Sequence, residues 1–172
     1  MTTEQLHYEF LGKYKIIEEI GRGAMGVVYK GFDTALERNV AIKTITSGEE
    51  SKESRERFIR EAKSIGKLSH NNIVTIYDFG NEPNRLYIVM EYLEGCTLNR
   101  IIQDKQPIEM IQKLDLIHQL CTGLSYAHSQ KVIHRDIKPA NLILDKNGIV
   151  KILDFGLAIM QASSLTRSGF MG

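Results

Sequence analysis

The sequence has no long apolar segment and few cysteines. No stretch approaches the roughly 20 apolar residues that a membrane-spanning helix needs, and the N-terminal MTTEQLHYEF lacks the apolar centre of a signal peptide. The two cysteines, Cys96 and Cys121, lie in unrelated contexts. These absences favour a reduced, cytoplasmic protein without a membrane segment in this chain.

The charges show no excess of either sign. The 22 basic and 21 acidic side chains give a formal net charge of +1, without a long block of one sign. This balance argues against a nucleic-acid-binding surface or a polybasic membrane patch. The five histidines show no paired metal-ligand spacing, so a structural zinc site is not expected. The length of 172 residues suits one domain or an unfinished larger one.

Hydrophobic patterning predicts an α+β fold with a strand-rich first half and a helical second half. β-Branched runs broken by glycine indicate antiparallel hairpins, and apolar residues at helical spacing indicate helices. The expected strands cover residues 14–45, 73–77, 86–92, 142–144 and 149–153, and the expected helices cover residues 51–68 and the stretch from Pro107 to Ser129. The turn sequence DKNG at 145–148 is a strong hairpin signal. The two halves are expected to join at Gly95–Thr97, and clefts that bind ligands commonly form at such joins.

The segment GRGAMGVV at residues 21–28 fits the pattern GxGxxGxV. Glycines let backbone N–H groups lie close to phosphate oxygens. The same spacing occurs in dinucleotide-binding folds, but there a strand precedes it and a helix follows. Strands are expected on both sides here, so the pattern leaves a phosphate-binding loop and an ordinary glycine hairpin as alternatives.

Lys43 stands at the end of the apolar strand VAIK, where a charged group needs an anionic partner or water. Glu61 lies three residues after Phe58 and four before Ile65, so it shares the apolar face of its helix. A carboxylate on a buried stripe is unusual. A pair between Lys43 and Glu61 would account for both features; the alternative is that Glu61 is exposed at the edge of the stripe.

The segment VIHRDIKPAN at residues 132–141 is dense in polar groups, and a DFG triplet begins at Asp154. Asp136 can accept or orient a hydroxyl proton. Lys138 can neutralise charge on a transferring phosphoryl group. Asn141 and Asp154 supply oxygen ligands of the type that Mg²⁺ prefers beside phosphate. Together these residues predict phosphoryl-transfer chemistry.

Taken in order, these five elements resemble the signature of the protein kinases, over residues 14–172. Lys138, two residues after Asp136, is similar to the serine/threonine kinases, and residues 20–29 and 86–97 look most like the eukaryotic-like kinases of bacteria. The resemblance implies transfer of the γ-phosphoryl group of ATP, with Mg²⁺, to protein Ser/Thr hydroxyls, and a role in bacterial signalling. It further implies a two-lobe fold, with an extension at 1–13, a small ATP-binding lobe at 14–94 and part of a large lobe at 95–172.

The resemblance also assigns roles residue by residue. Lys43, Glu61, Asp136 and Lys138 would be catalytic, and Asn141 and Asp154 would hold Mg²⁺. Met90 would be the gatekeeper, and His134 would serve packing in an internal spine instead of proton transfer. The implied ATP-binding residues are Ile20, Gly21, Arg22, Gly23, Ala24, Met25, Gly26, Val28, Ala41, Lys43, Met90, Glu91, Leu93 and Ile143.

Regulation and completeness follow from the same resemblance. Arg135 precedes the catalytic aspartate, and kinases with this pair are commonly activated by phosphorylation of the activation loop, here at Thr166 first or Ser168; the alternative is that both are small polar loop residues. The family continues with an A-P-E motif and more helices, which hold the substrate platform. We therefore expect a fragment with an exposed apolar face on the helix from Pro107 to Ser129, and the alternative function is a nucleotide-binding module without turnover. Membrane anchors beyond this segment are common in bacterial relatives.

Overall fold

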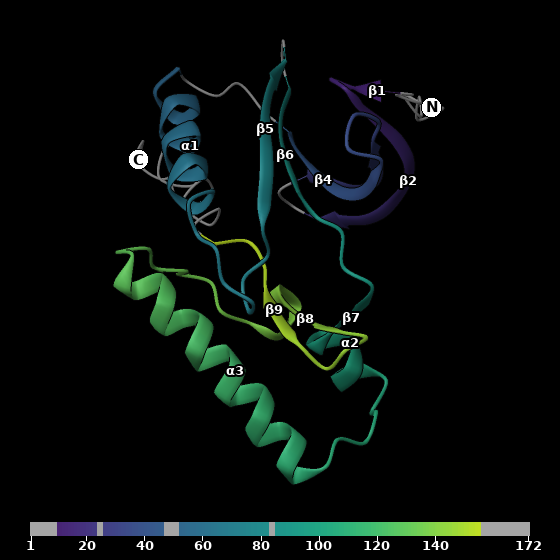
Figure 1. Ribbon diagram of the computed structural model, residues 1–172, viewed down its shortest axis with the longest axis vertical. Coiled ribbons are helices and arrows are strands. Elements are labelled where there is room, and N and C mark those ends of the chain that lie inside the picture. Colours follow the sequence, from purple (N-terminus) through teal and green to yellow (C-terminus); the bar gives the residue numbers. More distant parts are fainter. Residues whose placement is uncertain (1–9, 24–25, 47–51, 83–84, 156–172) are drawn as a thin grey trace, which may run out of the picture. The chain divides into compact units, whose positions relative to one another are not determined.

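The computed structural model describes residues 10–23, 26–46, 52–82 and 85–155 (Figure 1). The strands are β1 (Phe10–Leu11), β2 (Tyr14–Gly23), β3 (Gly26–Asp33), β4 (Arg38–Thr46), β5 (Ile76–Glu82), β6 (Arg85–Glu91), β7 (Gly95–Thr97), β8 (Leu142–Asp145) and β9 (Val150–Ile152). The helices are α1 (Lys52–Ile65), α2 (Leu98–Gln103), α3 (Met110–Ser129) and the short 3₁₀ turn η1 (Pro139–Asn141). They form two compact units, one of Met1–Gly48 with Ile76–Tyr92 and one of Glu49–Thr75 with Leu93–Gly172.

The first unit contains a six-stranded sheet in the order β1-β2-β3-β4-β6-β5. Every neighbouring pair is antiparallel, which confirms the hairpins expected from the glycine-broken, β-branched runs. The β2 strand contains two register shifts and bends strongly around the unit (Figure 1). Such irregularities increase the local twist of a strand, so the sheet curls instead of lying flat.

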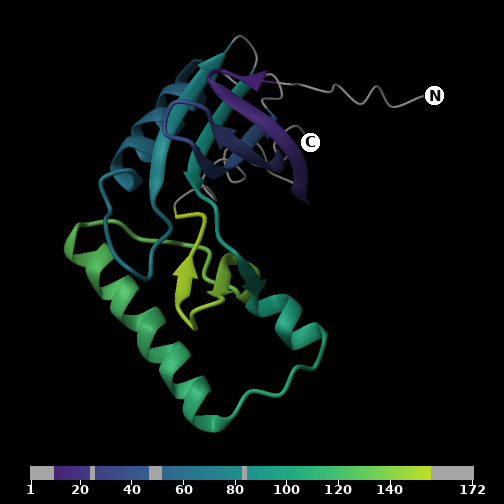
Figure 2. The ribbon, with the colours of Figure 1, turned by 45° about the vertical axis from the view of Figure 1, so that its right-hand side comes forward.

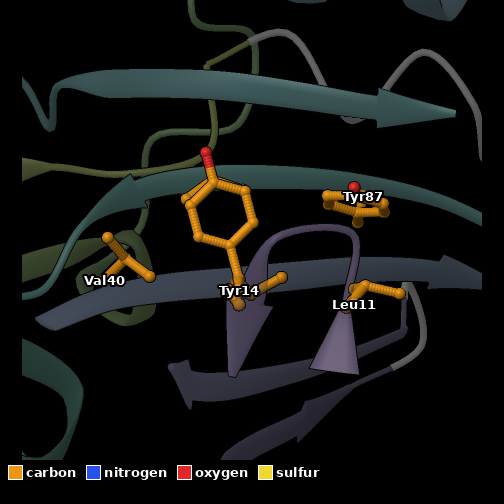
Figure 3. Close-up of a cluster of buried hydrophobic side chains, with 6 residues drawn as sticks. Leu11, Tyr14, Val40 and Tyr87 are labelled. Carbon is orange, nitrogen blue, oxygen red and sulfur yellow. The ribbon is translucent and has the colours of Figure 1, made fainter. Parts of the chain in front are cut away.

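The curled sheet brings its two edges together. Although β1 and β5 stand at opposite ends of the strand order, the Gly12 N–H donates to Glu82 Oε1 at 2.9 Å and the Tyr14 hydroxyl donates to Asp78 Oδ2 at 2.7 Å. A buried cluster fills the interior, with Leu11, Tyr14, Val40 and Tyr87 gathered between the strands (Figure 3); its members are Leu11, Tyr14, Val40, Ile42, Tyr87 and Val89.

Tyr87 fits into this core because Gly80 lies beneath its ring. A Cβ at Gly80 would meet the Tyr87 ring at 1.8 Å, which no real contact permits. Glycine is therefore required at this β5 position for close approach rather than for a turn.

The second unit is built on α3 and a three-stranded antiparallel sheet in the order β7-β8-β9. The α3 helix runs alongside the hairpin of β8 and β9 in both views (Figures 1 and 2). The predicted DKNG hairpin is confirmed: the Asp145 carboxylate accepts from the N–H groups of Asn147 and Ile149, and Gly148 has a φ of +80°. Glycine suits that left-handed backbone.

One strand and one short helix differ from the sequence prediction. The strand expected at 73–77 is β5 at Ile76–Glu82, and residues 73–74 instead join β9 through a parallel bridge between Ile73 and Ile152. The helix α2 was not predicted; its N-cap is Thr97, whose hydroxyl accepts from the Arg100 N–H at 3.2 Å. A six-residue helix is too short for a clear periodic signal, which explains the omission.

The long helix begins later than expected. Pro107 suggested its start, but α3 begins at Met110, where Glu109 and Gln112 form a reciprocal capping box. The side chains and backbone N–H groups of these two residues satisfy each other at the helix start.

Much of the apolar surface of α3 is exposed, as the sequence predicted. Met110, Ile111, Leu114 and Ile117 are 69, 70, 56 and 57% exposed. The covered face carries small residues instead, with Gly123 and Ala127 buried. In the described part of the chain, no helix is long and apolar enough to cross a membrane.

Candidate active site

The register of β3, β4 and β6 brings several predicted ATP-binding residues onto one face of the sheet. Val28 pairs with Lys43, and Ala41 pairs with Met90. Cross-strand partners point to the same face, as do residues two apart on one strand. Val28, Ala41, Lys43 and Met90 therefore lie side by side, and Lys43 is only 7% exposed. This arrangement places one cation at the edge of an apolar surface.

The opposite face of the same strands carries the core. Val40 and Ile42 alternate with Ala41 and Lys43 along β4, and both belong to the buried cluster described above. This alternation is what separates the two faces. The face with Lys43 carries none of the residues of that cluster.

The glycine-rich segment forms a hairpin between β2 and β3. Gly21 pairs with Val28 and Gly23 pairs with Gly26, so strands flank the segment on both sides and the dinucleotide-binding arrangement of strand and helix does not occur. Gly26 has a φ of +128°, which requires glycine. At Gly23, an added Cβ would meet no described atom within 4 Å. Ala24 and Met25 lie outside the described residues.

The remaining predicted ATP-binding residues are distributed over both units. Ile20 is 45% exposed on β2. Arg22 is held by Glu19 on its own strand, with Nη2–Oε2 and Nε–Oε1 distances of 2.6 and 2.9 Å. The Glu19 carboxylate raises the pKa of this exposed guanidinium. Glu91 is half-buried at the end of β6 in the first unit, whereas Leu93 and Ile143 are half-buried in the second.

In the second unit, the loop before β8 brings two predicted residues to the carboxylate of a third, Asp136. Lys138 Nζ lies 2.7 Å from Asp136 Oδ2. Asn141 Nδ2 donates both to the Asp136 carbonyl oxygen at 2.8 Å and to its Oδ2 at 3.1 Å. The hydrogen bond from Lys138, with that from Asn141, lowers the pKa of Asp136 against the opposing effect of desolvation. Asp136 is therefore ionised at neutral pH.

His134 is buried next to this loop and forms hydrogen bonds with the backbone of Asp136 and Leu153. Its ring is 1% exposed and stacks at a tilt on Phe155, with centroids 4.6 Å apart. The Asp136 N–H donates to His134 Nδ1 at 3.2 Å. A backbone N–H can only donate, so Nδ1 accepts and Nε2 carries the proton that it donates to the Leu153 carbonyl at 2.6 Å. Burial lowers the pKa of His134, in agreement with this neutral tautomer.

Two residues next to these groups have left-handed backbones. Arg135 has a φ of +69° and Asp154 a φ of +56°, which is uncommon for residues with a side chain. The surrounding bonds hold this geometry, since the Leu153 N–H donates to the Asn141 carbonyl at 2.9 Å and Phe155 is buried. Uncommon conformations of this kind cluster at functional sites.

Four further predicted residues lie wholly or partly outside the described part of the chain. The backbone of Glu61 lies in α1, but its side chain is outside the description, so its pairing with Lys43 stays a prediction. Gly156 of the DFG triplet, Thr166 and Ser168 also lie outside the described residues.

Two polar residues near the site were missed by the sequence analysis. Asn72 and Gln119 contact each other, with Asn72 Nδ2 donating to Gln119 Oε1 at 3.0 Å, and both contact β9. Gln119 precedes the buried Gly123 and Ala127 by four and eight residues. This spacing places it on the covered face of α3, and a polar residue at such a position was the available signal.

The comparisons with known proteins decide the family. A profile described as "Protein kinase domain" matches residues 14–172. The chain belongs to the protein kinase family. This kinase chain is 42% identical over 165 residues to the probable serine/threonine-protein kinase PknB of Lactococcus lactis, covering 94% of this chain and 26% of the relative. It is 42% identical over 154 residues to the serine/threonine-protein kinase PrkC of Bacillus subtilis, covering 89% and 24%.

A solved structure confirms the predicted kinase fold. The crystal structure of the PknI kinase domain of M. tuberculosis matches with a TM-score of 0.76 at 29% identity, covering 85% of this chain and 59% of that one. The kinase chain spans about a quarter of the length of the curated relatives named above.

Proposed function

We propose that this chain is the ATP-binding and catalytic-loop portion of a protein serine/threonine kinase of bacterial signalling. The parent protein would transfer the γ-phosphoryl group of ATP to Ser/Thr hydroxyls of protein substrates in the cytoplasm. The observation that carries the proposal is the ionised Asp136, held by Lys138 and Asn141 in the loop where the family places its catalytic aspartate.

Asp136 would receive and orient the substrate hydroxyl. Its lowered pKa keeps the carboxylate ionised, so it can accept a hydrogen bond from Ser or Thr at neutral pH. The same low pKa makes it a weak base, which favours orientation of the hydroxyl over early removal of its proton. Lys138, 2.7 Å away, would offset negative charge gathering on the transferred group.

The residues present fit Mg²⁺ and ATP. Asn141 Nδ2 donates to Asp136, which leaves the Asn141 amide oxygen as a hard ligand for the metal. Asp154 would supply the second oxygen ligand. Bound Mg²⁺ would neutralise phosphate charge. Val28, Ala41 and Met90 offer the apolar surface that an adenine ring needs, with Lys43 beside it for the phosphates. The open space at Gly23 suits close approach of a phosphate.

Three substitutions test this assignment in the longest protein that the gene encodes. Asp136→Asn should leave Mg-ATP affinity nearly unchanged but lower phosphate transfer about 10²- to 10⁴-fold, because the amide no longer orients the substrate hydroxyl or accepts its proton as the reaction completes. Asp154→Asn should instead raise the Mg²⁺ concentration needed for nucleotide binding. Lys43→Met should weaken nucleotide binding modestly and abolish transfer. Asp104→Asn, the same chemical change at an exposed helix end, is the control and should behave as wild type.

The outcomes separate the proposed kinase from its alternative. Transfer within a few-fold of wild type in Lys43→Met or Asp136→Asn would refute the assignment of these residues. Mg-ATP binding without any transfer by the wild type would favour a nucleotide-binding module without turnover, which the match to only 59% of the PknI kinase domain keeps as the second candidate.

Regulation would involve the residue before the catalytic aspartate. Arg135 would pair with a phosphate on Thr166 or Ser168, and this pair would activate the kinase.

A further inference from the structure

The outer edge of β9 is satisfied by groups that come from elsewhere in the chain. One edge of β9 pairs with β8. On the other edge, the Ile152 N–H donates to the Asn72 carbonyl at 2.9 Å and the Ile152 carbonyl accepts from the Val74 N–H at 3.0 Å. Backbone groups on a strand edge need such partners when water is excluded.

Val150 lies on the same outer edge, and two side-chain amides satisfy it. The Val150 N–H donates to Gln119 Oε1 at 2.8 Å, and the Val150 carbonyl accepts from Asn72 Nδ2 at 3.0 Å. Since Asn72 Nδ2 also donates to Gln119 Oε1 at 3.0 Å, the three groups form a closed ring.

Gln119 uses both ends of its amide. While Oε1 accepts from Val150 and Asn72, Nε2 donates to Asp115 Oδ2 at 2.7 Å and to the Gly148 carbonyl at 3.1 Å. A backbone N–H can only donate, and a carbonyl or carboxylate only accepts, so these partners leave a single orientation for the amide. Gln119 therefore joins α3 to both the turn and the strand of the hairpin.

The hairpin itself does not depend on Gln119. Leu144 pairs with Val150, and the Asp145 carboxylate accepts hydrogen bonds across the turn. Neither contact involves Gln119. What Gln119 adds is the position of β9 along α3. At its far end, β9 leads into Leu153, whose N–H donates to Asn141 and whose carbonyl accepts from His134, and then into Asp154.

We propose that Gln119 is a positioning residue that sets β9 against α3 and thereby places Asp154 relative to the catalytic loop. It acts through Val150 and the strand, without touching substrate or metal. The role in catalysis rests on the kinase function proposed above, whereas the effect on the strand does not.

The first experiment uses charge to disturb and then restore the junction. Gln119→Glu keeps the acceptor for Val150 but sets a carboxylate against Asp115, in the place of a 2.7 Å hydrogen bond. In the longest protein that the gene encodes, we expect the Mg²⁺ concentration for half-maximal transfer to rise about tenfold, because a shifted β9 would displace Asp154. Indirect changes around metal ligands have effects of this size. Adding Asp115→Asn supplies an amide donor to the new carboxylate and should restore the Mg²⁺ dependence to within about threefold of wild type.

Controls separate positioning from general damage. Gln103→Glu makes the same change at an exposed residue of α2 and should leave the Mg²⁺ dependence unchanged. Gln119→Ala should shift the Mg²⁺ dependence, and Asp115→Asn should not rescue it, because no side chain remains to accept the Val150 N–H. An unchanged Mg²⁺ dependence in Gln119→Glu and Gln119→Ala would overturn the catalytic role.

Amide hydrogen exchange provides a readout that does not need activity. In Gln119→Ala, the Val150 amide should lose protection, and the Leu153 amide should lose protection with it, although Leu153 bonds to Asn141 and not to Gln119. Unchanged Leu153 protection would refute the positioning of the strand. If the wild type binds and transfers nothing, the proposed function fails, and this exchange experiment still decides the role of Gln119.

Discussion

At the scale of single residues, one backbone N–H determines the protonation of His134. Because the Asp136 amide donates to Nδ1, a protonated imidazole would place two N–H groups against each other. The ring is also 1% exposed and covered by Phe155, so the charged form would be poorly solvated. Both effects favour the neutral ring. This supports a role for His134 in packing against Phe155 and in orienting the backbone of Asp136.

A dependence of stability on pH follows from this environment. Burial lowers the folded-state pKa of His134 below its unfolded value of about 6.5, so the unfolded chain binds more protons in that range. The stabilisation is therefore complete above about pH 6.5 and declines as the pH falls through the folded pKa. Asp136, whose pKa is also lowered, loses its contribution only at lower pH, below about 4.

Urea unfolding between pH 7.5 and 5.5 measures this effect. The free energy of unfolding should fall with decreasing pH in the wild type and fall less steeply in His134→Gln. His118→Gln, at an exposed position of α3, should keep the wild-type slope. Equal slopes for wild type and His134→Gln would contradict the lowered pKa of His134.

At the scale of elements, the closure of the curled sheet depends on a few polar contacts. The Tyr14 hydroxyl reaches Asp78 Oδ2, and Lys13 Nζ lies 3.9 Å from the same oxygen. Burial, followed by the hydrogen bond to Asp78, raises the pKa of Tyr14, so the phenol stays protonated and keeps donating. β1 and β2 are thus tied to β5, the strand at the far end of the order.

Removing the Tyr14 hydroxyl should weaken this closure. Tyr14→Phe keeps the buried ring but loses the bond to Asp78, which should lower the free energy of unfolding by about 1.5–3 kcal/mol for a bond to a charged group. Denaturant unfolding of Tyr14→Phe, Asp78→Asn and the double variant gives the coupling energy.

The coupling should be about 0.5 kcal/mol or more if the two groups interact as described. Tyr29→Phe on β3 is the matched control, since in the described part of the chain its hydroxyl has no hydrogen-bond partner. Additive losses from Tyr14→Phe and Asp78→Asn would show that the edge contact contributes no stability of its own.

At the scale of the whole chain, several large apolar side chains of α3 are exposed. Ile111 and Leu114 are more than half exposed, and contiguous apolar patches mark interaction or aggregation surfaces. An apolar helix face is therefore available for association in the 172-residue chain.

Substitution on this face should change association without changing folding. In the 172-residue chain, Ile111→Lys with Leu114→Lys should reduce self-association in sedimentation, while the free energy of unfolding changes by no more than about 0.5 kcal/mol per site. Ile101→Lys on α2, where the side chain is 6% exposed, is the contrasting control and should destabilise strongly because it buries a charge. A double variant as unstable as Ile101→Lys would mean that the α3 face is covered.

The sequence by itself determined the parts of the protein that depend on near neighbours. The DKNG turn satisfies its own backbone through Asp145, and alternation along VAIK separates Lys43 from the core. The loop around Asp136 follows equally, because Lys138 and Asn141 lie only two and five residues away in the chain. Local propensity and spacing suffice wherever the interacting groups are this close.

Only the tertiary structure decided the contacts that join distant segments. Tyr14 and Asp78 are 64 residues apart, and Asn72 and Val150 are 78 apart. No periodicity within one element specifies such a partner, because the contact depends on how a strand curls or where a strand edge is left open. Residues 73–74 therefore read as part of a strand in the first sheet but satisfy β9 instead. Gln119 joins α3 to β9 for the same physical reason. The backbone groups of Val150 require hydrogen-bond partners, and the fold brings the Gln119 amide within reach.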